Sequence, residues 1–203
     1  MAVDDASSSR AAPALVLGST SPYRRALLDR LRLPFEVAAP LVDETALPGE
    51  SCEALALRLA LAKARAVADR YPGAVVIGSD QVADLEGQPL GKPGCHDRAA
   101  EQLRLMRGRS VVFQTAVAVV CVHTGFQQME LASVRVRFRS LSDLEIEAYL
   151  RAEQPYDCAG SAKSEGLGIC LLDSIDSDDP TALVGLPLIR TCRMLRAAGI
   201  QLP

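Results

Sequence analysis

Residues 14–22, ALVLGSTSP, place a strand signal directly before a helix signal. Residues 14–18 form a short, continuous apolar run that ends in glycine, which is typical of a buried strand. Ser21 is expected to cap a helix that has Pro22 at its first helical position. That helix is predicted over residues 22–31, because Pro34 disfavours helical backbone immediately before it. A buried strand that leads straight into a helix indicates an α/β fold.

The alternation of strand and helix signals continues to the end of the chain. Further strands are predicted over residues 35–39, 74–78, 111–122 and 129–138, and further helices over residues 53–71, 97–107, 142–152 and 187–198. Asp97 is expected to cap one of these helices, and Ser142 with Glu145 forms a capping box at another. We expect one mixed α/β domain over residues 14–203, a twisted sheet flanked by helices with a central cleft. Residues 1–13 are expected to form a disordered tail.

Composition excludes several classes of protein. Hydrophobic residues make up 49 % of the 203, enough for a substantial core. The 22 basic and 25 acidic residues leave a net charge of −3, which argues against a nucleic-acid partner. No apolar run approaches the roughly 20 residues of a membrane span. Six cysteines without C-x-x-C spacing predict small buried thiols in a reducing compartment, and the motifs of zincins, α/β-hydrolases and P-loop proteins are missing.

Three segments carry polar residues suited to a phosphorylated ligand. Residues 18–25, GSTSPYRR, put Arg24 and Arg25 at a helix start, where a bound anion would draw both guanidiniums together; solvated arginines are the alternative. Asp80 follows the strand at 74–78, where α/β proteins gather ligands, although aspartate also commonly ends a strand. Residues 158–168, CAGSAKSEGLG, combine three glycines with Lys163 and Glu165, or form a flexible surface loop.

Three further charged residues are ambiguous by themselves. Lys63 borders the apolar stripe of its predicted helix, where a lysine normally extends its amine to solvent. Lys92 lies between Gly91 and Pro93, which restrict the backbone, but most lysines in turns are merely solvated. Glu44 follows Asp43 in a segment without a strong pattern.

Taken together, these segments resemble the Maf-like nucleotide pyrophosphatases. The resemblance rests on seven blocks in the family's order and spacing, over about residues 14–199: STSPYRR, VDE, a helical Ala-Lys-Ala, IGSDQV, LGKP, AGSAKSEGLG and VGLPL. It implies a fold similar to that of Maf proteins and inosine triphosphatases. Gln81 and Glu165 resemble the branch that acts on 7-methyl-GTP, whereas Tyr23 stands where that branch often has tryptophan.

The implied reaction is hydrolysis of a nucleoside triphosphate between the α and β phosphates, which gives a monophosphate and diphosphate. By resemblance, the phosphate contacts come from Ser19, Arg24, Lys63 and Lys92. Glu44 and Asp80 are similar to the carboxylates that hold a divalent cation, and an all-oxygen site suits Mg²⁺ or Mn²⁺. The resemblance makes Asp80 the proton acceptor, and the sequence leaves open whether it also ligates the metal.

Base selection has its own set of residues in this resemblance. Tyr23 offers a face on which a cationic, N7-methylated guanine would stack. Glu165 would accept the adjacent N1–H and N2–H groups of guanine, and Gln81 would contact another base edge. The alternatives are a dTTP or UTP pyrophosphatase of the same family, or a non-catalytic nucleotide sensor linked to arrest of septum formation. The resemblance alone suggests a homodimer and a cytoplasmic location.

Overall fold

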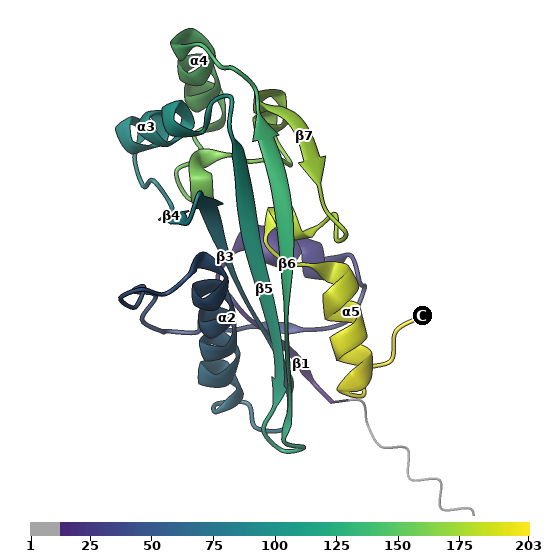
Figure 1. The fold of residues 1–203 in the computed structure, drawn as a ribbon. Helices are drawn as coiled ribbons and strands as arrows, with labels where there is room; N and C mark the ends of the chain where they lie inside the picture. The colour runs from purple at the N-terminus through teal and green to yellow at the C-terminus, as the bar shows by residue number, and fades with distance from the viewer. Residues whose placement is uncertain (1–12) are drawn as a thin grey trace, which may run out of the picture.

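The computed structural model describes residues 13–203, and its centre is one mixed sheet of seven strands (Figure 1). The strand order is β2-β1-β3-β5-β6-β7, with β4 paired to the far end of β3. The strands are β1 (Leu15–Gly18), β2 (Glu36–Val37), β3 (Val75–Leu85), β4 (Gln88–Leu90), β5 (Ser110–Cys121), β6 (Phe126–Phe138) and β7 (Leu172–Asp176). Strand β1 is parallel to β2 and β3, and all the other pairs are antiparallel. The expected mixed α/β domain is confirmed.

Within the described part of the chain, five α-helices and three short 3₁₀ helices accompany the sheet. The α-helices are α1 (Pro22–Asp29), α2 (Cys52–Ala68), α3 (His96–Met106), α4 (Asp143–Glu153) and α5 (Leu188–Ala197). The 3₁₀ helices are η1 (Ala159–Ser161), η2 (Leu167–Leu171) and η3 (Ala182–Val184). None of the helices between residues 13 and 203 has both the length and the apolar character that a membrane span requires.

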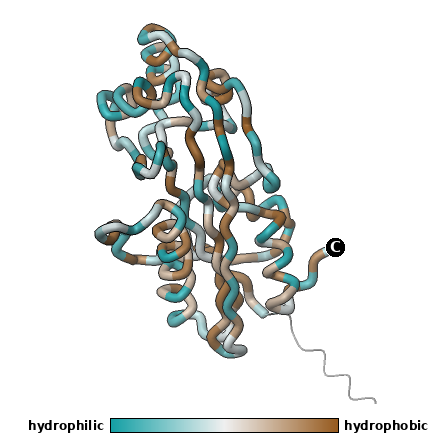
Figure 2. Tube along the Cα trace, in the orientation of Figure 1, coloured by the Kyte–Doolittle hydropathy of each residue, from teal (hydrophilic) through white to brown (hydrophobic). Residues whose placement is uncertain are grey.

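The core forms three clusters that divide the molecule into two halves. In one half, α2 packs on one face of the sheet and α1 with α5 on the other. In the other half, α3 and α4 pack on a single face, around Phe113 and Phe138. The central strands are therefore apolar on both sides in the first half, as the brown stretches of Figure 2 show. In the second half β6 alternates between buried valines and exposed arginines, as its sequence predicts.

Strands β3, β5 and β6 run through both halves. Strand β5 pairs with β3 from Val112 to Val120 and with β6 along its whole length. Strand β3 is thus much longer than the predicted strand at 74–78, because antiparallel pairing with β5 carries it on after its parallel neighbour β1 has ended. Sequence pattern could not show this extension, since Ser79, Asp80 and Gln81 interrupt the apolar run.

The helix boundaries agree with the predicted ones to within three residues, but one predicted cap is wrong. Cys95, not Asp97, is the N-cap of α3, and Asp97 lies in the first turn, where its charge still favours the helix dipole. The capping box of Ser142 and Glu145 is confirmed. Strand β2 is two residues long instead of five.

The cysteines only partly follow the expectation of small buried thiols. Cys52 and Cys121 are buried, but Cys95 and Cys170 are exposed and the other two are intermediate. All six are free thiols. The tail expected at residues 1–13 lies outside the described residues, except for Pro13.

Candidate active site

A cavity of about 540 Å³ lies between the two halves, against the edge of β3. Strand β1 ends where Gly18 pairs with Gly78, and β4 joins β3 only from Ala83 onwards. Between these points the edge of β3 has no neighbouring strand, so residues from distant loops reach it. The sequence placed Asp80 beyond the end of a strand, which is wrong. Asp80 is inside β3, at the point where its parallel neighbour stops.

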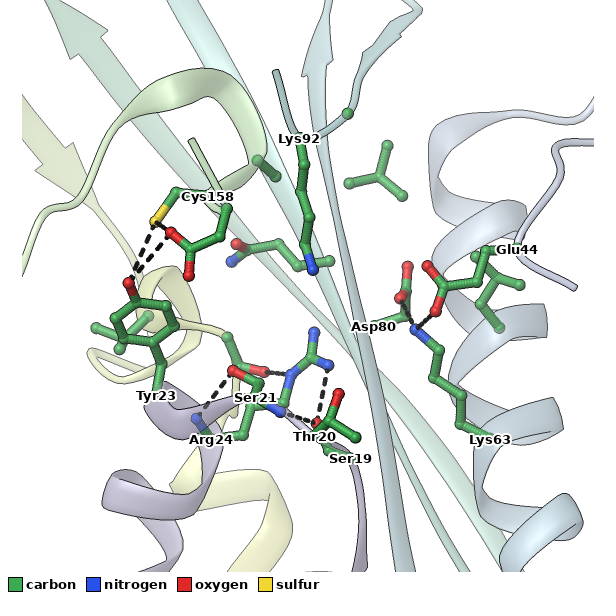
Figure 3. A pocket seen from close by; sticks show the side chains of 18 of the residues that line it. Ser19, Thr20, Ser21, Tyr23, Arg24, Glu44, Lys63, Asp80, Lys92 and Cys158 are labelled. Atoms are coloured by element: carbon green, nitrogen blue, oxygen red, sulfur yellow. Dashed lines mark hydrogen bonds and ion pairs between the residues drawn. The ribbon is translucent and has the colours of Figure 1, made fainter. Parts of the chain in front are cut away.

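The cavity brings together all the site residues that the sequence predicted (Figure 3). They come from the β1–α1 loop, α1, the segment before α2, α2 itself, β3, the turn after β4 and the loop after α4. The set is Ser19, Tyr23, Arg24, Glu44, Lys63, Asp80, Gln81, Lys92 and Glu165. Which of them touch a substrate stays a prediction.

Lys63 joins the two predicted carboxylates. Its Nζ lies 2.6 Å from Asp80 Oδ1 and 2.6 Å from Glu44 Oε1. The side chains of Lys63 and Asp80 are only 6 % and 9 % exposed, whereas that of Glu44 is 58 % exposed. The default expectation that Lys63 extends to solvent is therefore wrong. The ion pairs with Asp80 and Glu44 offset the free-energy cost of burying the charged amine of Lys63.

The two carboxyl groups differ in pKa because they differ in environment. Burial raises the pKa of Asp80 above its usual value, although the charges of Lys63 and Arg24 act in the opposite direction. Burial also raises the pKa of Glu44, but the hydrogen bond and charge of Lys63, with Lys92 and Arg24, outweigh it and lower that pKa overall. Asp80 is thus the better proton acceptor of the two, and Glu44 the one that stays ionised most readily.

The close approach of α2 to β3 fixes the position of Lys63. A Cβ on Gly78 would lie 2.3 Å from Ala60 O and 2.4 Å from Ala64 N, both in the backbone of α2. Only glycine allows helix and strand to come this near. Lys63 precedes Ala64 in α2, and Asp80 lies two residues beyond Gly78 on the same face of β3. The lysine amine therefore reaches the carboxylate directly.

Arg24 is anchored from behind by a backbone carbonyl. Its Nε donates to Gly185 O at 2.8 Å, and its Nη1 is 3.5 Å from Ser19 Oγ. Ser21 caps α1 by accepting a hydrogen bond from Arg24 N, and Ser19 Oγ accepts one from Ser21 N. Burial lowers the pKa of Arg24, and the charges of Asp80 and Glu44 partly offset this. The guanidinium and the start of α1 make this wall of the cavity suited to an anion.

The expectation that both arginines converge on one anion is wrong. Arg25 is exposed and lines a separate depression with Asp29 and Phe35. Successive residues of a helix point about 100° apart, so neighbours cannot both face one site. Lys92 instead supplies further positive charge: it is exposed, lines the cavity and forms no ion pair with the described residues. In Figure 3 its amine points into the same space as the Arg24 guanidinium.

The other end of the cavity is aromatic and acidic. Tyr23 Oη donates to Asp157 Oδ1 at 3.3 Å and lies 3.9 Å from the Cys158 thiol. Burial, with the charge of the nearby Asp157, raises the pKa of the Cys158 thiol to about 12, although the hydrogen bond with Tyr23 acts in the opposite direction, so this thiol is unreactive at neutral pH. Glu165 is exposed and lines the same end. Sequence analysis missed Asp157, which has no pattern of its own.

Lys163 does not enter the phosphate end of the cavity. Its Nζ donates to Glu153 Oε1 at 2.7 Å and lies 5.6 Å from the centroid of the Tyr23 ring. Glu153 also accepts a hydrogen bond from Leu167 N at 2.7 Å. This pair of bonds holds the loop that carries Glu165, so the loop is tied down and is not a free surface loop.

Gln81 lies on the face of β3 opposite to Asp80, since successive residues of a strand point in opposite directions. Its Nε2 is within 3.0 Å of Thr115 Oγ1, Ala182 O and Leu183 O, so the protein holds both amide protons. Its Oε1 accepts no hydrogen bond from the described residues. Gln81 lines the cavity, and its amide nitrogen is bound by the protein.

The carboxylates of Asp80 and Glu44 are of the chemical kind that could hold a cation jointly with a substrate. Residues 13–203 contain no group of three or more His, Cys, Asp or Glu side chains that could enclose a metal ion. Asp80 and Glu44 do approach one point, which Lys63 Nζ occupies. Mg²⁺ typically binds through one or two carboxylates, with phosphate oxygens and water completing its shell. Two carboxylates beside an anion-binding wall match that pattern.

Comparison with known proteins gives a consistent result. The family model described as "Maf-like protein" matches residues 14–198. A protein of Albidiferax ferrireducens named 7-methyl-GTP pyrophosphatase is 75 % identical over 187 residues, 92 % of this chain and 94 % of the relative. One from Polaromonas sp. with the same name is 77 % identical over 188 residues, 93 % and 86 % of the two chains. A third, from Burkholderia thailandensis, is 63 % identical over 193 residues, 94 % and 90 %.

Proposed function

The chain belongs to the Maf-like family, and from this premise we propose that it is a nucleoside triphosphate pyrophosphatase that hydrolyses 7-methyl-GTP to 7-methyl-GMP and diphosphate. The names and high identity of the relatives support this substrate. The observation that carries the proposal is the polarity of the cavity. One end holds Arg24, Lys63 and Lys92, and the other an aromatic ring among carboxylates. A nucleotide has the matching polarity, with its phosphates at one end and its base at the other.

The phosphate end of the cavity places several positive side chains around the triphosphate of the substrate, which carries about four negative charges. Arg24 is held through Nε by Gly185 O and lines the cavity. Lys92 approaches from the opposite wall, and Lys63 lies between the carboxylates. Charge that is fixed before the substrate binds stabilises the transition state without reorganisation at the moment of reaction.

Asp80 is the group that we assign as proton acceptor. Water attacks the α-phosphorus, a proton passes from this water to an Asp80 carboxylate oxygen, and diphosphate leaves with the electron pair of the broken bond between the α-phosphorus and the bridging oxygen. The raised pKa of Asp80 makes it a stronger base than an ordinary aspartate. The charge of its neighbour Lys63 favours the ionised form and so opposes the effect of burial.

We propose that Glu44 and Asp80 also hold a divalent cation, Mg²⁺ or Mn²⁺, when the substrate is present. When bound, the cation would neutralise charge on the phosphate oxygens and polarise the scissile bond. Glu44 suits this role because its pKa is lowered and its side chain is largely exposed to incoming ions.

The base end explains a preference for a methylated purine. N7-methylation gives guanine a positive charge, which an aromatic face attracts, and Tyr23 supplies such a face. Asp157 and Glu165 add negative charge to the same end. Gln81 Oε1 offers an acceptor to a base N–H, and Glu165 suits the paired N1–H and N2–H donors of guanine.

Release of diphosphate from 7-methyl-GTP, GTP, UTP and dTTP tests the proposal. We expect the highest kcat/KM with 7-methyl-GTP and a loss of roughly 10²-fold or more in kcat for Asp80→Asn. Asp84→Asn is the matched control, because Asp84 is in the same strand and bonds Gly87 N outside the cavity. Activity with UTP above that with 7-methyl-GTP would assign the protein to pyrimidine nucleotides, and no hydrolysis of any triphosphate would favour a sensor.

A cytoplasmic location and a homodimer also belong to the proposal. The free thiols fit a reducing compartment, where nucleoside triphosphates are also found. The homodimer rests on the family resemblance alone, and light scattering measures it directly.

A further inference from the structure

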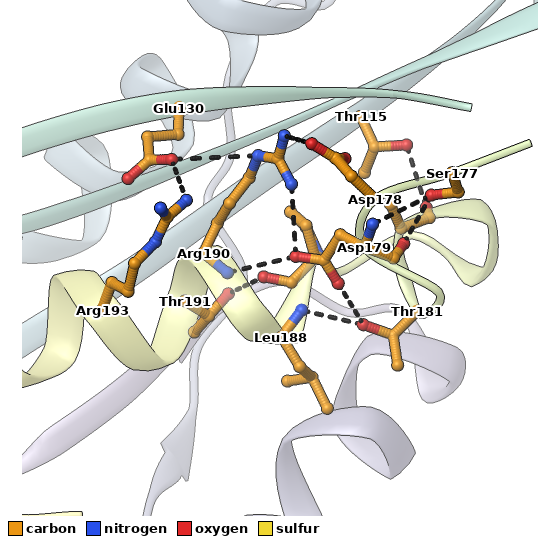
Figure 4. Close-up of polar contacts among 12 residues, drawn as sticks. Thr115, Glu130, Ser177, Asp178, Asp179, Thr181, Leu188, Arg190, Thr191 and Arg193 are labelled. Carbon is orange, nitrogen blue, oxygen red and sulfur yellow. Dashed lines mark hydrogen bonds and ion pairs between the residues drawn. The ribbon is translucent and has the colours of Figure 1, made fainter.

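A single turn behind the cavity supports side chains from two different elements. This turn, residues 179–188, runs from β7 through η3 to the start of α5 (Figure 4). Arg24 of α1 donates from Nε to Gly185 O at 2.8 Å. Gln81 of β3 donates from Nε2 to Ala182 O and Leu183 O, both at 3.0 Å. The phosphate end and the base end of the cavity thus rest on carbonyls of one short segment.

Thr181 closes this turn from the inside. Its Oγ1 lies 2.8 Å from Leu186 O and accepts a hydrogen bond from Leu188 N at 2.8 Å. The same oxygen is 3.2 Å from Asp179 Oδ1. Gly185 lies within the loop that these bonds close and has a φ of +119°, which side-chain-bearing residues rarely adopt. The Thr181 hydroxyl thus holds the loop that carries the Gly185 carbonyl, while Ser79 Oγ donates a hydrogen bond to that carbonyl directly, at 2.9 Å.

Asp179 anchors the turn to the rest of the molecule. Its carboxylate is wholly buried and accepts a hydrogen bond from Arg190 N at 3.1 Å, with Arg190 Nη1 at 3.6 Å. Arg190 continues the chain of contacts to Leu131 O of β6 and to Asp178. A buried carboxylate with this many partners fixes one arrangement, because any other would leave its charge unpaired.

We propose that Thr181 is a positioning residue for the reaction, acting through Gly185 O on the Arg24 guanidinium. Neither Thr181 nor Asp179 lines the cavity, so they act only through the turn. The inference rests on the proposed function insofar as Arg24 is taken to contact phosphate. A displacement of the Gly185 carbonyl turns the guanidinium, and misplacement of a binding group by about 1 Å costs up to about 10²-fold in rate.

Thr181→Val tests this, because valine keeps the shape and removes the hydroxyl. Thr191→Val is the matched control: Thr191 is also buried and bonds a backbone carbonyl, Pro187 O, at 2.7 Å, but its hydroxyl does not close the turn. We expect Thr181→Val to lower kcat/KM for 7-methyl-GTP roughly tenfold to a hundredfold. We expect Thr191→Val to stay within about twofold of the wild type, and Thr181→Ser to restore the activity.

A double-mutant cycle separates positioning from general destabilisation. Arg24→Lys keeps a positive charge but lacks the Nε–H that Gly185 O accepts. In that background we expect Thr181→Val to cost less than about twofold, because the link from the turn to the guanidinium is already broken. Equal losses in both backgrounds, or a loss no larger than that of Thr191→Val, would overturn the inference.

Two further outcomes are covered by a second variant and by a binding measurement. If Thr181→Val does not fold, Thr181→Ala takes its place in the cycle, since it fills less space. Calorimetric titration with inorganic tripolyphosphate reports on the phosphate contact of Arg24 without nucleotide hydrolysis. We expect Thr181→Val to weaken the binding of tripolyphosphate roughly tenfold. A wild type that binds tripolyphosphate but hydrolyses no nucleotide would refute the proposed function, while the titration would still decide the role of Thr181.

Discussion

Gly78→Ala is the substitution that most directly tests how the site is held together. The added Cβ would lie 2.3 Å from Ala60 O and 2.4 Å from Ala64 N. Both atoms belong to the backbone of α2, so no side-chain rotation relieves the clash. Ordinary van der Waals contact begins near 3.4 Å, and α2 must therefore move away from β3 by about 1.1 Å. Since Lys63 moves with α2 while Asp80 stays in β3, their contact of 2.6 Å lengthens beyond hydrogen-bonding distance.

The expected cost falls on both stability and activity. Overpacking a core costs about 1–3 kcal/mol, and backbone obstruction places this case near 3 kcal/mol. For a chain of this size each kcal/mol lowers Tm by roughly 2–4 °C, so we expect a fall of roughly 6–12 °C. Displacing Lys63 from Asp80 should lower kcat about 10²-fold, measured as diphosphate release at a temperature where the variant is fully folded.

Gly73→Ala provides the control, because it is the same substitution with no atom within 4 Å of the new Cβ. It should change stability by less than about 0.5 kcal/mol and leave kcat unchanged. A Gly78→Ala protein with the Tm and kcat of Gly73→Ala would refute the argument that the α2–β3 approach sets the Lys63–Asp80 pair.

Four further predictions concern the site and the fold. Lys92→Ala should lower kcat/KM for 7-methyl-GTP and UTP by a similar factor, of the order of ten, because both share the phosphate chain; a changed ratio would place Lys92 elsewhere. Glu165→Gln should lower the ratio of kcat/KM for 7-methyl-GTP to that for UTP roughly tenfold to a hundredfold, since its new NH₂ faces guanine donors; a constant ratio contradicts the assignment. Treatment with EDTA should abolish diphosphate release and Mg²⁺ should restore it, so full activity after chelation argues against a metal. Glu145 has its pKa lowered to about 2 by hydrogen bonds from Ser142 and Arg139. The contribution of the Glu145 carboxylate to stability is therefore present above its usual pKa near 4.5 and is lost as the pH falls towards 2. In urea unfolding, the free energy of unfolding of Glu145→Gln should differ from that of the wild type at about pH 6, and progressively less below about pH 4.5.

Local signals predicted most of the elements. The apolar run at residues 14–18, the Ser21–Pro22 start and the capping box of Ser142 each act over a few residues, and each is confirmed. Asp97 failed as a cap because the N-cap of α3 is Cys95, two residues earlier. The length of β3 depends on pairing with β5, some 40 residues away, so no local pattern contains it.

In the candidate site, too, the sequence predicted which residues take part but not the contacts that they make. The cavity gathers the residues expected from the seven blocks, but their contacts arise only in the folded chain. Nothing in the neighbourhood of Lys63 predicts its burial, because the two carboxylates that pair with it come from other segments. The sequence left open whether Arg25 shares the anion with Arg24, because adjacency in sequence does not give a shared direction on a helix. Asp157 and the support of Arg24 by Gly185 required the tertiary structure.

Strands β3, β5 and β6, which cross both halves of the molecule, bear on how the chain unfolds. A boundary between independently melting units needs a place where few hydrogen bonds cross, and the ladder of β5 and β6 is continuous from Ser110 to Cys121. Neither half can lose its strands without exposing the core of the other. Heat or denaturant should therefore disrupt both halves in one all-or-none transition, with equal calorimetric and van't Hoff enthalpies. Because the cleft lies between two halves that unfold cooperatively, we expect both of its walls to unfold in the same transition.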